Sequence, residues 1–343
     1  MSGAQAGGRQ PRRAIGRRAV LVPVLAGVIM APWAHARDAP PLATGGRPWR
    51  IGWLSAAPDP KASQREVEVF AGAMRDKGWV LGEHYVIDRR DGRGDPQRFA
   101  ALAAELVAAK PDLLLAVETT AKAYRRHTTA IPVVLYASLD PVAAGLVHSL
   151  SRPGTHVTGI TTVADALTVK NVEALLELVP RARRIVMLTD RDWSGVARVT
   201  GAAQTAARAK GAELEVLAIT AEPASVRAAL EQLQLRRPDG VVLLTSGAVI
   251  AHAAGLRAGI IAQKLPATGL TAAGAILRNG WNFDECLRES TDFVDRILRG
   301  AIPADLPVRQ LMRVEVTLDL GLARAVGVEV PAALRIRADK VIE

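Results

Sequence analysis

Hydrophobic and polar positions along the chain follow two alternating patterns. Short, continuous apolar runs such as 113–117 and 133–137 predict strands that are buried on both faces of a parallel sheet. Between such runs, apolar residues recur at intervals of three and four, as Val67, Phe70 and Met74 do, which is typical of an amphipathic helix. Strands are therefore expected to alternate with helices along most of the chain.

This alternation runs through two successive series, which predict an α/β fold with two doubly wound parallel sheets. The expected strands are 50–54, 85–88, 113–117, 133–137, 156–162, 184–188, 214–219 and 240–244, with a last strand and helix over 314–326. The expected helices include 142–150, 248–263 and 283–298.

Ligands of such sheets bind beyond the carboxyl ends of the strands. At these ends the chain carries mostly small hydroxyl and acidic residues, which we take as candidate ligand-binding residues. They are Ser55, Glu118, Thr119, Thr120, Ser138, Asp140, Asp190 and Ser246, together with Gly269.

Several of these candidates have a purely structural alternative. Thr119 and Thr120 lie between a buried strand and a helix start, where free N–H groups and the helix dipole favour an anion such as a carboxylate, but either threonine could equally cap the helix. Asp140 could bind a ligand ammonium or hydroxyl group, or cap the helix that follows it. Asp190 and Asp192 could form a catalytic acid pair, or serve as caps and solvated charges.

Aromatic residues make up only 4% of the chain, yet Tyr136, Trp193 and Trp281 fall near expected cleft loops. An amphipathic ring at such a place could stack on an apolar or aromatic ligand. Trp53 lies inside the first expected strand and is predicted to belong to the core.

Residues 1–36 have the features of an export signal. They contain five arginines and no acidic residue, and the apolar run 19–32 precedes a small-x-small cleavage motif at Ala34-His35-Ala36. The run is shorter than the about 20 residues that span a bilayer. Arg17-Arg18 fits a twin-arginine signal as well as an ordinary secretory one, so both routes stay open. We expect cleavage near Ala36 and a periplasmic protein.

Charge and cysteine content narrow the function classes. The formal net charge is +10, but five of the arginines lie in the export segment and most others form short scattered pairs. Without a basic stripe interleaved with aromatics, nucleic-acid binding is not expected. The single cysteine, Cys286, excludes an intramolecular disulfide and is predicted to be a small buried hydrophobe on a helix.

The sequence lacks the common enzyme signatures. The six histidines have no zinc-ligand spacing, and there is neither a G-x-S-x-G elbow nor a phosphate-binding loop. Gly92-Arg93-Gly94 lacks the third glycine of a dinucleotide fingerprint. We therefore expect no catalytic residue, no metal site and no cofactor.

A series of short motifs extends over nearly all of the chain beyond the export segment. They are Gly94-Asp95-Pro96, Leu102-Ala103-Ala104-Glu105-Leu106-Val107, Lys110-Pro111-Asp112, Asp140-Pro141-Val142, Gly145-Leu146-Val147, Arg152-Pro153-Gly154, Val157-Thr158-Gly159 and Pro303-Ala304-Asp305-Leu306-Pro307. In their order and spacing the chain resembles the ABC-transporter substrate-binding proteins of the type I periplasmic-binding-protein fold, in the branch with amino-acid-binding members.

The resemblance implies two lobes joined by three crossings, closing on a small polar ligand, with amino-acid-like molecules among the candidates. The expected lobes are 50–158 with about 275–303, and 159–268 with about 304–343, the run 157–162 being the first crossing. A monomer that delivers its ligand to an ABC permease in the membrane is implied as well. By position, the resemblance places Ser55, Thr119, Thr120, Asp140, Asp190 and Ser246 on the cleft, with Thr161 and Asn279 at crossings.

Three departures from the family pattern bear on the ligand. The usual Gly-Thr-Pro is Glu118-Thr119-Thr120, which brings a negative charge near the expected carboxylate site. The loop after Leu188 lacks the usual Asn-Pro, and Asn279 stands where a tyrosine is common. Two alternatives to transport remain: an exported ligand sensor, and a hydrolytic enzyme that uses Asp190 or Glu118 as acid or base in the same cleft.

Overall fold

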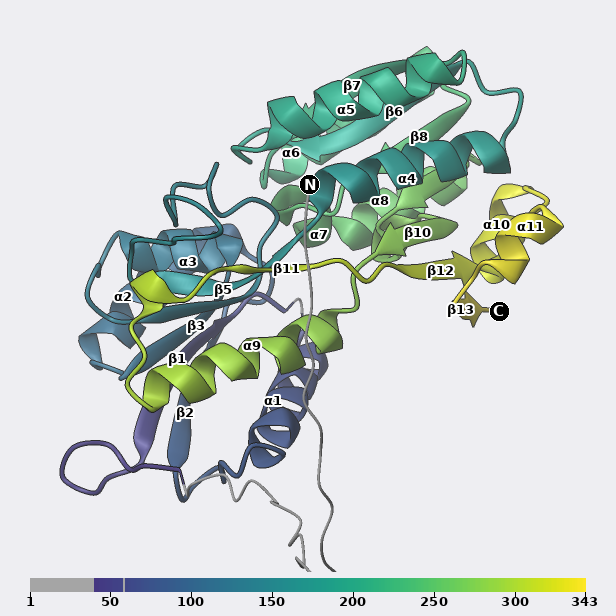
Figure 1. The fold of residues 1–343 in the computed structure, drawn as a ribbon. Coiled ribbons are helices and arrows are strands. Elements are labelled where there is room, and N and C mark those ends of the chain that lie inside the picture. The colour runs from purple at the N-terminus through teal and green to yellow at the C-terminus, as the bar shows by residue number, and fades with distance from the viewer. Residues whose placement is uncertain (1–39, 58) are drawn as a thin grey trace, which may run out of the picture. The chain divides into compact units, whose positions relative to one another are not determined.

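Two β-sheets organise the chain in this computed structural model, which describes residues 40–57 and 59–343 (Figure 1). The predicted export segment, residues 1–36, lies outside the described residues. Within the described part, no helix is long and apolar enough to cross a membrane.

The first sheet has six strands in the order β11-β5-β4-β3-β1-β2, and all neighbours pair in parallel. Its strands are β1 (Trp49–Ser55), β2 (Tyr85–Asp91), β3 (Leu113–Val117), β4 (Val133–Ala137), β5 (Val157–Thr162) and β11 (Arg309–Leu311). The helices that accompany it are α1 (Pro60–Arg75), α2 (Pro96–Ala108), α3 (Glu118–Arg125) and α9 (Phe283–Leu298), with the short 3-10 turn η2 (Pro303–Asp305). We call this sheet and its helices the first lobe.

The second sheet has seven strands in the order β13-β12-β10-β9-β8-β6-β7, parallel except for the antiparallel pair β10/β12. Its strands are β6 (Arg184–Asp190), β7 (Glu213–Ile219), β8 (Gly240–Leu243), β9 (Ala267–Gly269), β10 (Leu277–Gly280), β12 (Glu315–Asp319) and β13 (Lys340–Ile342). Its helices are α4 (Ala164–Leu178), α5 (Val196–Ala209), α6 (Pro223–Arg236), α7 (Gly247–Ala251), α8 (Ala253–Ala262), η1 (Thr271–Ala273), α10 (Leu320–Val326) and α11 (Ala332–Ile336). This group is the second lobe.

The two parallel-dominated sheets confirm the predicted α/β fold class, and the chain passes between them three times. The passes follow β5, β10 and β11. The run 157–162, expected both as a strand and as the first crossing, is strand β5, which pairs with β4 and β11 inside the first sheet, so the chain crosses only after it. Sheet membership also gives β10 to the second sheet and β11 to the first, whereas the expected boundaries lay near 275 and 304.

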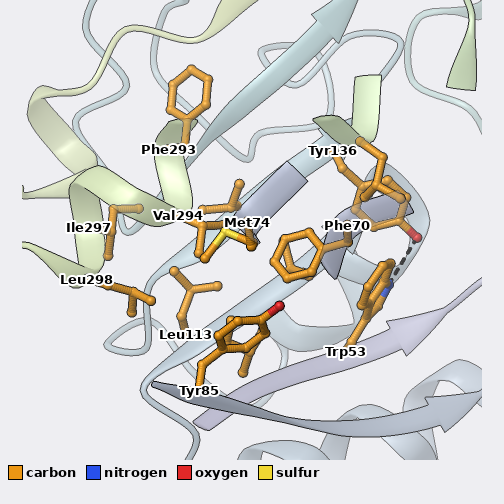
Figure 2. Close-up of a cluster of buried hydrophobic side chains, with 14 of the residues drawn as sticks. Trp53, Phe70, Met74, Tyr85, Leu113, Tyr136, Phe293, Val294, Ile297 and Leu298 are labelled. Atoms are coloured by element: carbon orange, nitrogen blue, oxygen red, sulfur yellow. Dashed lines mark hydrogen bonds between the residues drawn. The ribbon is translucent and has the colours of Figure 1, made fainter. Parts of the chain in front are cut away.

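A hydrophobic cluster holds α1 and α9 against the first sheet, as Figure 2 shows. Phe70 and Met74 of α1, Val294 of α9 and Trp53 of β1 belong to this cluster, and all four side chains are fully buried. The rings of Phe70 and Trp53 meet edge to face, with centroids 5.4 Å apart, an arrangement that aromatic pairs favour. Trp53 is therefore a core residue, as predicted. Cys286 is likewise buried on α9, as expected.

Two expected helices differ in the structure. Residues 142–150 form turns instead of a helix, and Gly145 there adopts a left-handed conformation (φ 66°) that a right-handed helix does not accommodate. The helix expected at 248–263 is split into α7 and α8 at His252. The first difference lies in the loop between β4 and β5, and the second is a single residue between two helices.

Candidate functional site

A cavity of about 500 Å³ is lined by residues of both lobes. It lies beyond the carboxyl ends of the strands, because the lining comes from segments that directly follow β1, β3, β4, β8 and β9 and from the end of β10. This is where the fold places ligands. Its volume falls within the roughly 300–1,000 Å³ that is usual for small-molecule sites.

Most of the cavity wall is apolar. The first lobe contributes small and aromatic side chains, and the second lobe contributes branched residues and an indole ring. The apolar lining consists of Ala56, Ala57, Ala62, Pro96, Phe99, Val117, Ala137, Leu139, Ile250, Leu270, Trp281 and Phe283. Trp281 is one of the three aromatic residues that the sequence placed near the cleft.

Glu118, which follows β3, binds the polar loop that follows β4. Its Oε2 accepts hydrogen bonds from Ser138 Oγ (2.8 Å) and from the backbone N–H groups of Leu139 and Asp140 (both 2.9 Å). Its Oε1 lies 3.5 Å from Lys122 Nζ, one helical turn away. The carboxylate is buried, and its charge is met by these donors. Glu118 therefore ties two cavity loops together in addition to lining the cavity.

Thr119 and Thr120 have different surroundings. Thr120 is fully buried, and its Oγ1 accepts a hydrogen bond from Val117 N at 3.1 Å, so it caps the start of α3. Thr119 lines the cavity. The N–H groups in the first turn of a helix have no acceptor within the helix, which leaves this turn suited to an anion.

Gly247 of the second lobe lies against Thr119 of the first. A Cβ added to Gly247 would lie 3.4 Å from Thr119 Cγ2 and 3.2 Å from Asp190 Oδ2. A Cβ there would make ordinary contact with Thr119 and a slightly tight one with Asp190, so the two lobes approach each other closely at Gly247 beside the cavity. Ser246, the preceding residue, also lines the cavity.

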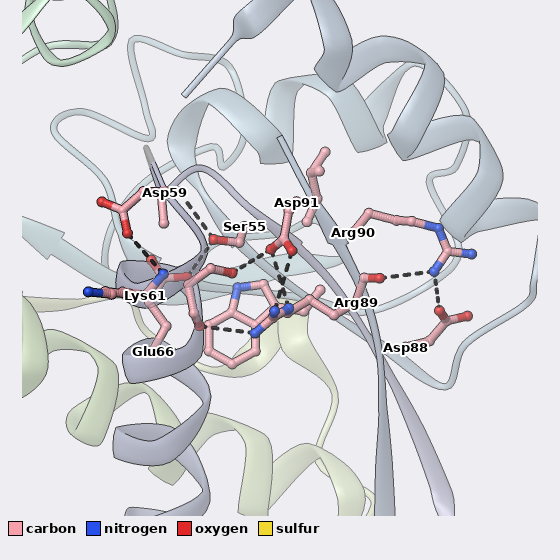
Figure 3. A network of polar contacts seen from close by, with 12 residues as sticks. Ser55, Asp59, Lys61, Glu66, Asp88, Arg89, Arg90 and Asp91 are labelled. Atoms are coloured by element: carbon pink, nitrogen blue, oxygen red, sulfur yellow. Dashed lines mark hydrogen bonds and ion pairs between the residues drawn. The ribbon is translucent and has the colours of Figure 1, made fainter. Parts of the chain in front are cut away.

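Glu66 of α1 is a buried carboxyl on the cavity wall that the sequence reading missed. Ser55 Oγ donates a hydrogen bond to Glu66 Oε2 at 2.6 Å, within the polar network of Figure 3. Burial raises the pKa of Glu66 to about 7, although the Ser55 hydrogen bond and the charge of Arg89 act in the opposite direction. Ser55 itself is buried beneath the cavity and positions this carboxyl.

Two arginines line the cavity, and they differ in their partners. Arg65 of α1 forms an ion pair with Asp284 of α9, with Nη2 and Oδ2 2.6 Å apart. Arg278 of β10 donates from Nη2 to the Trp281 carbonyl at 2.7 Å, and its guanidinium lies 5.8 Å from the centroid of the Trp281 ring. The sequence reading assigned no role to either arginine.

Several predicted residues lie away from this cavity. Tyr136 is fully buried in the core, where it accepts a hydrogen bond from Trp53 Nε1 at 3.3 Å. Trp193 is buried in a small apolar cluster beside α5. Gly269 is buried at the end of β9, although the two residues after it line the cavity. None of the three forms part of the cavity wall in this structure.

Asp140, Thr161 and Asn279 line neighbouring, smaller cavities. Asp140 accepts a hydrogen bond from Ala143 N at 2.9 Å, as a cap does, and its other oxygen lies 2.7 Å from Arg198 Nη2 of the second lobe. Asn279 exchanges hydrogen bonds with Asn171 of α4. The ligand-binding role proposed for these three residues stays a prediction.

Asp190 is held by backbone donors. Its Oδ2 accepts from Ala248 N and its Oδ1 from Asp192 N, both at 2.9 Å. This arrangement matches the structural alternative, in which Asp190 organises the start of α7. No group of three or more His, Cys, Asp or Glu side chains in residues 40–57 and 59–343 is arranged to hold a metal ion.

Comparison with known proteins places this geometry in a family. The family model described as "ABC transporter substrate binding protein" matches residues 60–342. A tyrosine-binding protein of Clostridioides difficile (strain R20291) is 25% identical over 276 residues, which is 78% of each chain.

Solved structures agree on the fold. A conserved domain protein from Vibrio cholerae superposes with a TM-score of 0.77 at 24% identity, covering 86% of this chain and all of that one. An ABC domain from Streptococcus pneumonia in complex with L-Trp gives a TM-score of 0.75 at 20% identity, with the same coverage. The chain thus belongs to the family of ABC transporter substrate-binding proteins.

Proposed function

We propose that this protein is an exported receptor that captures a small, amino-acid-like ligand in the cavity between its lobes and delivers it to an ABC importer. The observation that carries this proposal is the cavity itself, which both lobes line at the carboxyl ends of their strands. A ligand held there contacts both lobes and therefore stabilises the closed arrangement over an open one.

The cavity offers complementary surfaces for such a ligand. Thr119 and the first turn of α3 suit a polar ligand group that accepts hydrogen bonds, because the N–H groups and the helix dipole favour such a group. Phe99 and Trp281 offer rings against which an apolar or aromatic side chain packs. The relatives that bind tyrosine and L-Trp support an aromatic amino acid as the first ligand class to test.

Glu118 does not argue against a carboxylate at this place. Its negative charge was the departure from the family pattern that bore most directly on ligand charge. Three hydrogen-bond donors and Lys122 already meet that charge inside the protein. A negatively charged ligand in this cavity therefore meets a Glu118 carboxylate whose charge is largely compensated.

Export is supported by residues 1–36, whose arginines, apolar run and Ala34-His35-Ala36 motif are typical of a cleavable signal. Transport from that compartment is supported by membership of the family. A gene for an ABC permease beside this one would favour transport over a sensor role.

A thermal-shift panel of the twenty amino acids and their close analogues tests the proposal. A ligand that binds only the folded state at a hundredfold excess over its dissociation constant adds about 2.7 kcal/mol to the free energy of unfolding. We expect at least one panel member to raise the melting temperature in a concentration-dependent way and to decrease the radius of gyration in solution scattering. No response in either measurement from any compound would contradict the proposal.

A further inference from the structure

Arg278 lies on the cavity wall, and its guanidinium group forms no ion pair with any residue in the described ranges 40–57 and 59–343. Its Nε is buried and has no hydrogen-bond partner in the described part of the chain. Glu315 is an acidic residue whose charge acts to raise the pKa of Arg278. Its carboxylate oxygens already accept hydrogen bonds from Asn282 Nδ2 (2.7 Å) and Thr317 Oγ1 (3.4 Å). Burial lowers the pKa of Arg278, which shows that the surroundings disfavour its charge.

The protein nevertheless holds this guanidinium in a defined place. Arg278 and Gly280 lie on the same face of β10, and a Cβ at Gly280 would overlap the guanidinium. The hydrogen bond to the Trp281 carbonyl and the ring of Trp281 fix it further. A buried cation without a counter-ion is costly, and an arginine prefers a carboxylate that it can bind with two parallel hydrogen bonds.

The other charged side chains among the described lining residues already have ionic or hydrogen-bonding partners, so Arg278 is the group in this set that is suited to an anion of the ligand. Arg65 is paired with Asp284, and Glu118 is bound by backbone donors and Lys122. Glu66, hydrogen-bonded to Ser55, is shielded in the wall.

We infer that Arg278 binds a carboxylate of the ligand, so that the cavity selects compact carboxylates with an apolar or aromatic body over their neutral or cationic analogues. This inference rests on the proposed function, because it assigns the chemical class of the ligand in the same cavity. The carboxylate contributes affinity at Arg278 through charge-assisted hydrogen bonds in a partly desolvated wall.

A calorimetric comparison of matched compounds tests it. The compounds are L-phenylalanine, L-phenylalaninamide, 3-phenylpropionate and phenethylamine, with the corresponding tyrosine series, titrated into the wild-type protein, Arg278→Met and Arg208→Met. Arg278→Met keeps side-chain length and removes the charge. Arg208→Met removes an exposed charge on α5, away from the cavity, and controls for net charge.

We expect the wild type and Arg208→Met to bind the carboxylates more tightly than the amides and amines. In Arg278→Met, carboxylate binding should weaken by about 10- to 100-fold and the preference over the amide should disappear. Without ligand, Arg278→Met should melt at or above the wild-type temperature, because it removes a partly buried charge that has no ion-pair partner in the described part of the chain.

The possible failures are distinguishable. Binding by the wild type with an unchanged carboxylate preference in Arg278→Met would overturn the role of Arg278 and leave the proposed function intact. Wild-type binding of amides or amines in preference to carboxylates would have the same meaning. If none of these compounds binds the wild-type protein, this inference is contradicted, and the proposed function is contradicted as well only when the full amino-acid panel also gives no response.

Discussion

Glu66 is a residue of the cavity wall that its helical spacing in the sequence could have revealed. It lies four residues before Phe70 and eight before Met74, so the three side chains share one face of α1, and all three are buried. A carboxylate on the apolar face of a helix is unusual and signals a partner, here Ser55. The position of Glu66 on the apolar face is visible in the sequence, but the spacing of Val67, Phe70 and Met74 predicts the helix without it.

The raised pKa of Glu66 predicts a pH dependence of stability. The unfolded chain gives up this proton near pH 4.5, whereas the folded protein keeps it to about 7. The folded state therefore binds more protons across that window, and the free energy of unfolding falls as pH rises through it. Relative to Glu66→Gln, we expect the wild type to lose about 3 kcal/mol between pH 4.5 and pH 8, measured by chemical denaturation. Parallel curves for the two proteins would rule this out.

Glu118 predicts a large stability effect at a single site. Glu118→Ala leaves buried donors of Ser138, Leu139 and Asp140 without an acceptor and should lower the free energy of unfolding by about 2–4 kcal/mol. Glu118→Gln keeps an acceptor oxygen and should cost less. Lys122→Ala, which removes only the ion pair at 3.5 Å, should cost about 1 kcal/mol or less. Equal losses in Glu118→Ala and Lys122→Ala, measured by urea denaturation, would refute the role given to Glu118.

Arg278 and Asn279 show why part of the site could not be predicted from sequence. The two residues are neighbours on β10, so their side chains point to opposite faces of the sheet. The resemblance pointed to Asn279, which bonds to Asn171 of α4, while Arg278 lines the cavity. A one-residue uncertainty in strand register is enough to exchange the two roles.

At the scale of elements, continuous apolar runs and strong caps were the most predictable features. The bounds of β3, β4 and α9 agree with the expected ranges 113–117, 133–137 and 283–298. Asp95 caps α2 by accepting a hydrogen bond from Gln97 N at 2.9 Å. Short segments after the strands were less predictable, because a positive φ at Gly145 and the break at His252 depend on tertiary contacts that periodicity does not encode.

Substitution of Gly247, the first residue of α7, tests how closely the two lobes must approach each other for ligand binding. Gly247→Val should push against Thr119 and Asp190 and hold the lobes apart, because an added Cβ already lies 3.4 and 3.2 Å from them. We expect ligand affinity to fall by about tenfold or more, with the melting temperature of the ligand-free protein little changed.

Gly255→Val is the matched control, since a Cβ at Gly255 on α8 meets no atom within 4 Å. Its ligand affinity should equal that of the wild type. Equal affinities of Gly247→Val and Gly255→Val in calorimetric titration would show that the Gly247–Thr119 approach does not matter for binding.

For the molecule as a whole, the repeated strand–helix pattern predicted the two sheets, because each apolar run has one way to be buried on both faces. The places where the chain passes between the sheets were harder to predict from the sequence. The three-residue strand β11 joins the first sheet next to β5, and only its pairing with Ile160, Thr161 and Thr162 reveals this. Polar contacts across the lobes, Arg198 with Asp140 and Gln97 with Glu222, also depend on the assembled fold.

We propose that a small ligand binds in the cavity that both lobes line beyond the ends of their strands. The most direct test is a crystal structure of the protein with the compound that raises its melting temperature most. We expect density for that compound between Thr119 of the first lobe and Trp281 of the second. Density for the compound at another place, with this cavity filled only by water, would contradict it.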